Sequence, residues 1–297
     1  MKTSDLLAFR LNLMTTQQIP FLKAHGIGND FVVISGLTTD FNPTAEQVAT
    51  ICDRHLGIGA DGLLRVARAS EFGVDDAQYF MDYRNADGSV AETCGNGLRV
   101  FARYLVEHQL ESPGTFKIGT RAGTVTAHID PSDVSFENIA IEMGLPGGSL
   151  VNEVPKVTTE ISSWPATAVF MPNPHCVAIV EDVHSVGALH EPPHLAPREI
   201  FPSGANVEFI APITETRIAM RTFERGVGET LSCGSGACAA AHVWATKNNL
   251  PANWSVQVDV LGGTVHVDCQ SDGSLILRGP AEFVASGQLI GEQWQIS

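Results

Sequence analysis

Residues 91–105 read AETCGNGLRVFARYL, and residues 230–244 read TLSCGSGACAAAHVW. In each stretch a cysteine precedes two glycines that bracket one polar residue, and a run of helix-compatible residues follows. The two cysteines, Cys94 and Cys233, lie 139 positions apart. The pattern predicts that the chain twice places a thiol at a glycine-framed helix start, where unpaired backbone N–H groups are available.

The repetition continues on both sides of these two predicted helices. The strand-like segments 78–83 (QYFMDY) and 217–226 (RIAMRTFERG) precede the two cysteines. GTVTAHI at 123–129 matches GTVHVDC at 263–269, and MGLP at 143–146 resembles LRGP at 277–280. Matching elements in the same order predict two copies of one α/β unit. A protein with two such copies and one active site normally holds that site between them.

Composition limits the classes of function. A chain of 297 residues is long enough for two cores of roughly 150 residues each. The net charge of −15 argues against a partner made of nucleic acid or anionic lipid. No apolar run reaches roughly 18 residues, so no membrane-spanning helix is expected. Residues 1–20 lack the cleavage signature of a secretory signal and are predicted to form a poorly ordered extension. The six cysteines are therefore expected to be reduced, in the cytoplasm.

The two glycine-framed cysteines predict a particular chemistry. A helix N-terminus favours negative charge, so the pKa of a thiol there is expected to fall. Two such helix starts aimed at one point would also hold a carboxylate. One thiolate would then remove the hydrogen from the neighbouring carbon while the opposite thiol delivers a proton to the other face, and no step needs a cofactor. The backbone amides expected to stabilise the carbanion through its carboxylate are those of Gly95, Asn96, Gly234 and Ser235.

Other interpretations of the same residues fit less well. A Cys–His protease using His175 would leave one copy of the cysteine motif without a purpose. A zinc site at Cys238 and His242 lacks the usual ligand spacing, so no metal is expected. A pyridoxal enzyme is disfavoured by few lysines and no evident phosphate-binding loop. A non-catalytic amino-acid binding or redox-sensing module, with the two cysteines joined as a disulfide, stays open as an alternative.

Six motifs are distributed along the chain: HGIGNDF (25–31), GIGAD (57–61), NADGSVAETCGNG (85–97), NPH (173–175), GANVEF (204–209) and ERGVGETLSCGSGA (224–237). Together they resemble diaminopimelate epimerases over nearly the whole chain, from about Phe21 to Pro280. The resemblance implies conversion of L,L-2,6-diaminopimelate to the meso form, on the route to lysine and peptidoglycan, by a homodimer. It also implies two pseudo-symmetric α/β domains, each a curved mixed sheet wrapped around a central helix, with the active site in the cleft between them.

The resemblance further implies domain boundaries and residue roles. The C-terminal strand is expected to return to the first half, which gives residues 21–143 plus 280–297 as one domain and 144–279 as the other. Cys94 and Cys233 are the implied acid/base residues, and His175 and Glu224 are implied to tune them. The implied substrate contacts are Asn29, Asn85, Asn173, Asn206, Glu224 and Arg225. Such a set suits a ligand with an amino acid at each end, because Arg225 offers a bidentate carboxylate contact and Glu224 an ammonium contact.

Two positions depart from the family pattern. Gly62 follows the GIG-x-D motif where many members have glutamine, which removes a possible substrate contact. Pro172 precedes NPH where glycine is usual, and it restricts the backbone of the residue before it. These departures leave a second hypothesis open: a cofactor-independent racemase of another amino acid on the same scaffold.

Overall fold

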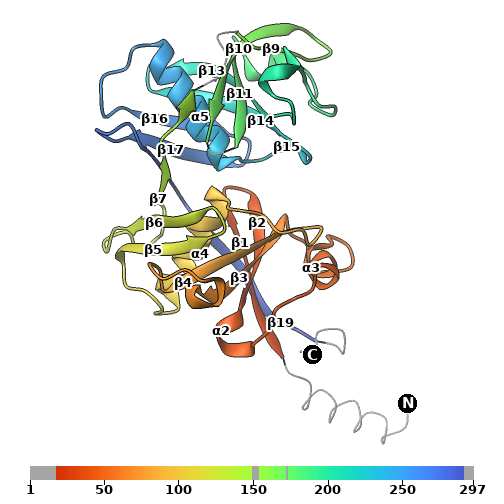
Figure 1. Cartoon of the computed structure of the whole chain (residues 1–297), viewed down its shortest axis with the longest axis vertical. Coiled ribbons are helices and arrows are strands. Elements are labelled where there is room, and N and C mark those ends of the chain that lie inside the picture. The colour runs from red at the N-terminus through yellow and green to blue at the C-terminus, as the bar shows by residue number, and fades with distance from the viewer. Residues whose placement is uncertain (1–17, 149–153, 172, 291–297) are drawn as a thin grey trace, which may run out of the picture.

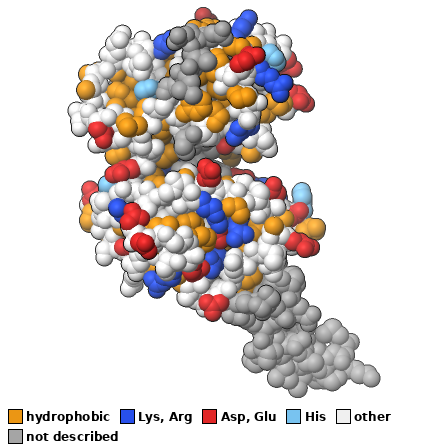
Figure 2. All heavy atoms as spheres, in the orientation of Figure 1, with side chains coloured by type: hydrophobic (Ala, Val, Ile, Leu, Met, Phe, Trp, Pro, Cys, Tyr) orange, Lys and Arg blue, Asp and Glu red, His pale blue; other side chains and the backbone are white. Residues whose placement is uncertain are grey.

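The computed structural model describes residues 18–148, 154–171 and 173–290. Two lobes stand end to end and meet at a narrow waist (Figures 1 and 2). The elements of the first half are β1 (Ile19–Gly26), β2 (Asn29–Ser35), α2 (Gly36–Thr39), α3 (Ala45–Cys52), β3 (Gly62–Arg68), the 3₁₀ turn η1 (Ala69–Phe72), β4 (Tyr79–Asn85), α4 (Gly95–Glu107), β5 (Gly114–Thr120), β6 (Gly123–Ile129) and β7 (Ile139–Gly144).

The second half follows a similar order, with additional short strands. Its elements are β8 (Gly147–Gly148), β9 (Lys156–Thr158), β10 (Ser163–Phe170), β11 (Pro174–Ile179), the 3₁₀ turn η2 (Val183–Val186), β12 (His194–Ala196), the 3₁₀ turn η3 (Arg198–Ile200), β13 (Asn206–Thr214), β14 (Arg217–Glu224), β15 (Gly228–Thr230), α5 (Gly234–Lys247), β16 (Ser255–Val260), β17 (Gly263–Cys269) and β18 (Leu275–Gly279). The additional short strands are β8, β9, β12 and β15. The last described strand, β19 (Glu282–Leu289), pairs antiparallel with β1 and so lies on the first half.

Strand pairing in the two halves follows one plan. In the first half β2 pairs parallel with β3 and β4 with β5, while β1–β2, β3–β4 and β5–β6 are antiparallel. In the second half β11–β13 and β14–β16 are the parallel pairs, and β10–β11, β13–β14 and β16–β17 are antiparallel. This agreement confirms the predicted pair of pseudo-symmetric mixed sheets. The two sheets are joined where β7 pairs with β18.

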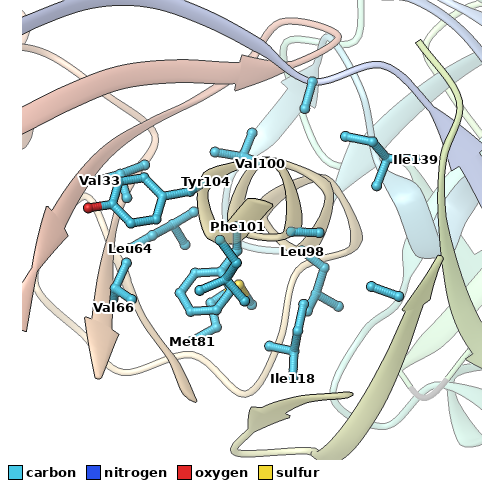
Figure 3. Packing of buried hydrophobic residues seen from close by; sticks show 14 of the residues in the cluster. Val33, Leu64, Val66, Met81, Leu98, Val100, Phe101, Tyr104, Ile118 and Ile139 are labelled. Atoms are coloured by element: carbon cyan, nitrogen blue, oxygen red, sulfur yellow. The ribbon is translucent and has the colours of Figure 1, made fainter. Parts of the chain in front are cut away.

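A single helix fills the middle of each half. Leu98, Phe101 and Leu105 form an apolar stripe on α4, and each is almost completely buried. Figure 3 shows this helix surrounded by strand residues such as Leu64 and Met81. Burying a large apolar side chain is worth about 2 kcal/mol, so this stripe is a main source of stability for the first half.

The second central helix, α5, is enclosed on nearly every side by strands of the second half. Residues 237–241 of α5, which read ACAAA, are fully buried, and the helix contacts strands from β10 to β18. Small side chains let the surrounding strands approach the helix closely. Cys238 is one of these core residues.

Most of the expected segments are found, with small differences at their ends. The predicted strand 78–83 corresponds to β4, which begins one residue later, and the predicted strand 217–226 corresponds to β14, which ends two residues earlier. β1 begins at Ile19, two residues before the expected start of the first domain, because Ile19 pairs with Leu289. The rest of the expected extension, residues 1–17, lies outside the described residues, as does Pro172.

Candidate active site

Cys94 is the residue that caps the start of α4. Its backbone is extended (φ −150°, ψ 119°), and its Sγ lies 3.5 Å from Oδ1 of Asn29. Burial raises the pKa of this thiol to about 11, while hydrogen bonds from the backbone N–H groups of Gly97 and Asn96 act in the opposite direction. The carboxylate of Glu224, from the other half, adds to the rise.

Cys233 occupies the equivalent place at the start of α5. Its Sγ lies 3.6 Å from Oγ of Ser235, and Nδ2 of Asn206 approaches it at 3.9 Å. Burial, followed by the charges of Glu224 and Glu208, raises the pKa of the thiol well above its ordinary value. The hydroxyl of Ser235 and the backbone of Gly236 lower it only in part.

These two environments correct one expectation. The helix starts were expected to lower the pKa of both thiols, and the prediction of a net decrease is wrong. The helix N–H groups do favour the thiolates, but Cys233 is buried and Cys94 is partly buried, and the loss of solvation outweighs the effect of the helix terminus.

One cavity of about 360 Å³ contains both cysteines at the junction of the two halves. The helix starts nearly touch there, since a Cβ placed on Gly234 would lie 3.4 Å from Cα of Gly95. The predicted residues that line the cavity are Asn29, Asn85, Cys94, Gly95, Asn96, Asn173, Asn206, Glu224, Arg225, Cys233, Gly234 and Ser235. Five of the six sequence motifs therefore contribute residues to one cavity, from both halves, and GIGAD (57–61) does not line it.

His175 is the predicted site residue that does not line this cavity. It is fully buried on β11, with Nδ1 2.8 Å from Oε1 of Glu208 and Nε2 3.0 Å from Oδ1 of Asn173. Because Asn173 does line the cavity, the ring touches the site through this side chain.

Glu224 and Arg225 follow one another at the end of β14. Oε1 of Glu224 accepts a hydrogen bond from Oγ1 of Thr230 at 2.6 Å. Burial raises the pKa of Glu224, with a further rise from the charge of Glu208. The Arg225 backbone N–H donates to Oδ1 of Asn206 at 2.9 Å, while its exposed guanidinium donates to the carbonyl of Ser203. A carboxyl group and an exposed cation therefore stand side by side at the cavity.

Asn96 is the most deeply buried of the asparagines at the cavity, and its side chain makes contacts across the two halves. Only 1% of it is exposed, and its Nδ2 donates to the backbone oxygen and to Oγ of Ser232, each at 3.1 Å. Its Oδ1 accepts from Nη2 of Arg99 at 2.9 Å. The side chain of Asn96 thus fastens the start of α4 to the residue before Cys233.

Comparisons with known proteins agree with this arrangement. The family model described as diaminopimelate epimerase matches residues 21–159 and 167–284. The diaminopimelate epimerase of Streptomyces coelicolor is 42% identical over 286 residues, which cover 91% of this chain and 95% of that protein. The corresponding enzyme of Corynebacterium glutamicum is 40% identical over 279 residues, with 91% and 98% covered.

The chain belongs to the diaminopimelate epimerase family. It is therefore an isomerase, an epimerase by type. Among solved structures, a phenazine biosynthesis protein of the PhzF family from Bacillus anthracis shares the fold, with a TM-score of 0.67 at 16% identity and with 92% of this chain and 99% of that chain covered.

Gly62, one of the two departures from the family pattern, has a structural reason. A Cβ at this position would lie 2.6 Å from the backbone oxygen of Arg84 and 2.7 Å from Cε2 of Tyr83. The ring of Tyr83 therefore occupies the space beside residue 62, and Tyr83 itself lines the cavity. In this member of the family an aromatic ring stands where a longer side chain at position 62 would begin.

Some residues at the site received no role from the sequence. Asp61 accepts a hydrogen bond from Nδ2 of Asn29 at 2.8 Å, and Glu208 holds His175. Both lie inside family motifs, GIGAD and GANVEF, which was the available signal. Ser232 also lies inside a family motif, ERGVGETLSCGSGA. Tyr83 lies outside the motifs, and its role depends on contacts across the fold.

Among residues 18–148, 154–171 and 173–290, no helix is long and apolar enough to span a membrane. No group of three or more His, Cys, Asp or Glu side chains in the same part is placed to hold a metal ion.

Proposed function

We propose that this protein interconverts L,L- and meso-2,6-diaminopimelate through Cys94 and Cys233. One cysteine, as thiolate, takes the Cα hydrogen as a proton and becomes a thiol, and the electron pair stays on the carbon and its carboxylate. The other thiol then gives its proton to the opposite face and becomes a thiolate. The configuration is inverted and the total number of protons is unchanged, so only the two sulfurs exchange their states.

The observation that carries this proposal is that the two capping cysteines line one cavity at helix starts that almost touch. The backbone N–H groups there suit the carboxylate, whose charge grows when the proton leaves. A buried thiolate with a raised pKa is also a stronger base, which helps with a weakly acidic Cα hydrogen.

The remaining polar side chains of the cavity suit the other charged groups of the same substrate. Arg225 can bind the distal carboxylate through two parallel hydrogen bonds, and Glu224 can accept from an ammonium group. Asn29, Asn85, Asn173 and Asn206 can each donate or accept. The family also supports a cytoplasmic homodimer acting in the formation of lysine and peptidoglycan precursors.

Proton exchange tests the proposal directly. The protein is incubated with L,L-diaminopimelate in deuterated water, with no cofactor added, and deuterium at Cα is followed by NMR. We expect exchange in the wild type, loss of epimerisation in Cys94→Ala and in Cys233→Ala, and retention in Cys269→Ala, a cysteine outside the cavity. Exchange with another amino acid but none with diaminopimelate would favour the racemase, and no exchange under reducing conditions would refute the catalytic role.

A further inference from the structure

The two halves carry different side chains at equivalent positions behind the two cysteines. Leu64 on β3 lies opposite Tyr83 on β4, and Glu208 on β13 lies opposite Thr222 on β14. Tyr83 and Thr222 precede their cysteines by the same number of residues. Glu208 is therefore the second-half counterpart of Leu64, and Thr222 that of Tyr83.

Contacts at the helix starts support this equivalence. A Cβ on Gly97, the last glycine of the first motif, would meet Cδ2 of Leu64 at 3.4 Å. A Cβ on Gly236, its counterpart in α5, would meet Oε1 of Glu208 at 2.6 Å and Sγ of Cys233 at 3.3 Å. The same place behind the helix start thus holds a methyl group in one half and a carboxylate in the other.

Glu208 is an unusual residue to find there. Its side chain is fully buried, and among the described residues its Oε2 has no hydrogen-bond partner. Its Oε1 faces Nδ1 of His175 at 2.8 Å. Thr222, on the same face of the sheet, also has a buried Oγ1 without a partner in the described part of the chain. Burying a carboxylate is costly, and the first half shows that the fold itself can use leucine at this place.

We propose that Glu208 is a positioning residue for Cys233: it fixes the ring of His175 through Nδ1 and places a carboxylate beside the start of α5. The inference rests on the proposed role of Cys233. The carboxylate of Glu208 makes the two thiols chemically different although their backbones are equivalent. Behind Cys94 the corresponding position is Leu64, which carries no charge.

The charges around the two sulfurs agree with this assignment. Cys233 is surrounded by Glu224 at the end of β14, by Glu208 on β13 and, behind Glu208, by His175 on β11, with Cys94 across the cavity. After burial, the charges of Glu224 and Glu208 both raise the pKa of Cys233. For Cys94 burial and the charge of Glu224 act upward, and Glu208 is not among the causes.

Alkylation of each thiol as a function of pH tests the proposal. Wild type and Glu208→Gln are treated with iodoacetamide over a pH series, and the Cys94 and Cys233 peptides are quantified separately by mass spectrometry. We expect the midpoint for Cys233 to fall by about one pH unit or more in Glu208→Gln, and the midpoint for Cys94 to stay in place. Glu208→Asp should restore most of the wild-type profile.

The matched control is Glu142→Gln. Glu142 on β7 is an exposed carboxylate that also faces a histidine, His128, at 2.9 Å, and it does not line the cavity. This change should move neither midpoint. A shift at Cys233 no larger than in the control, or equal shifts at both cysteines, would overturn the role of Glu208.

A second measurement needs no variant. In wild-type protein labelled with ¹⁵N-histidine, Nδ1 of His175 is expected to carry a proton that exchanges slowly with water, because it donates to buried Glu208. An unprotonated Nδ1 would also overturn the assignment. Both measurements are independent of turnover, so a wild type that exchanges no substrate hydrogen would refute the proposed function without deciding the role of Glu208.

Discussion

Replacing Asn96 by alanine should weaken the attachment between the two halves. The side chain makes two hydrogen bonds to Ser232 at 3.1 Å and accepts one from the guanidinium of Arg99 at 2.9 Å. Two neutral buried hydrogen bonds contribute about 1 kcal/mol each and the charged one about 2 kcal/mol, which predicts a loss of about 4 kcal/mol in the free energy of unfolding.

The state of Arg99 makes the loss hard to relieve. Arg99 is completely buried, and its Nη1 already has no partner among the described residues. Burial lowers the pKa of its guanidinium to about 10, a sign of how poorly the charge is solvated. Without Asn96, the only hydrogen bond left to the guanidinium group in the described chain is the one from Nε to the carbonyl of Pro280, at 3.1 Å.

Urea denaturation followed by tryptophan fluorescence measures the effect. With a slope of about 3 kcal/mol per molar, a loss of this size lowers the midpoint by about 1 M. The control is Asn248→Ala at the end of α5, where one part-buried hydrogen bond to the carbonyl of Trp244 is lost and the cost is about 1 kcal/mol or less. A midpoint for Asn96→Ala no lower than that of the control would refute the reasoning.

Three further predictions concern the cavity and the first half. Gly62→Ala should cost about 2 kcal/mol in unfolding free energy, because the new Cβ would lie 2.7 Å from the ring of Tyr83 and 2.6 Å from a backbone oxygen. An unchanged urea midpoint would contradict this prediction. Asp30→Asn should cost about 2 kcal/mol in unfolding free energy at pH 7. Neighbouring cations hold the pKa of Asp30 at about 2 against 3.8, despite its partial burial. This contribution to stability is therefore present above pH 4 and is lost toward pH 2. Urea midpoints that differ equally at pH 7 and pH 2 would contradict it. Arg225→Lys should raise KM for diaminopimelate about tenfold with a smaller change in kcat, as the bidentate contact is lost, whereas Arg217→Lys, remote from the cavity, should leave KM unchanged.

The helix starts and the internal repeat were predictable because their signals are local. The glycine-framed cysteines of residues 91–105 and 230–244 appear as the caps of α4 and α5. The repeated order of strands then required the two cysteine motifs to come from equivalent halves. The helix starts and the order of the strands depend on residues that are neighbours along the chain. Composition and spacing are therefore sufficient to predict them.

What the sequence could not give depends on burial and on contacts across the fold. A helix start predicts a lower thiol pKa, but how far Cys94 and Cys233 are removed from water is set by the packing of both halves. Asn96 was expected to serve the substrate through its backbone, and nothing local indicates that its side chain is used by Ser232. Glu208 sits in an alternating strand pattern, and only the equivalence with Leu64 shows how unusual a carboxylate is there.

The charge balance of the cavity links the raised pKa values to the proposed substrate. Burial raises the pKa of Cys94, Cys233 and Glu224 together, so negative charge in this site is unfavourable unless a cation accompanies it. Diaminopimelate brings two ammonium groups, and each one placed near these side chains favours their ionised forms. In the proposed reaction an ammonium group of the substrate helps to ionise the thiol that removes the Cα proton, while its two carboxylates, which act in the opposite direction, are bound by the helix N–H groups and by Arg225. The two thiols then titrate as a coupled pair, and a pH–rate profile reports values that belong to the pair and not to either cysteine alone.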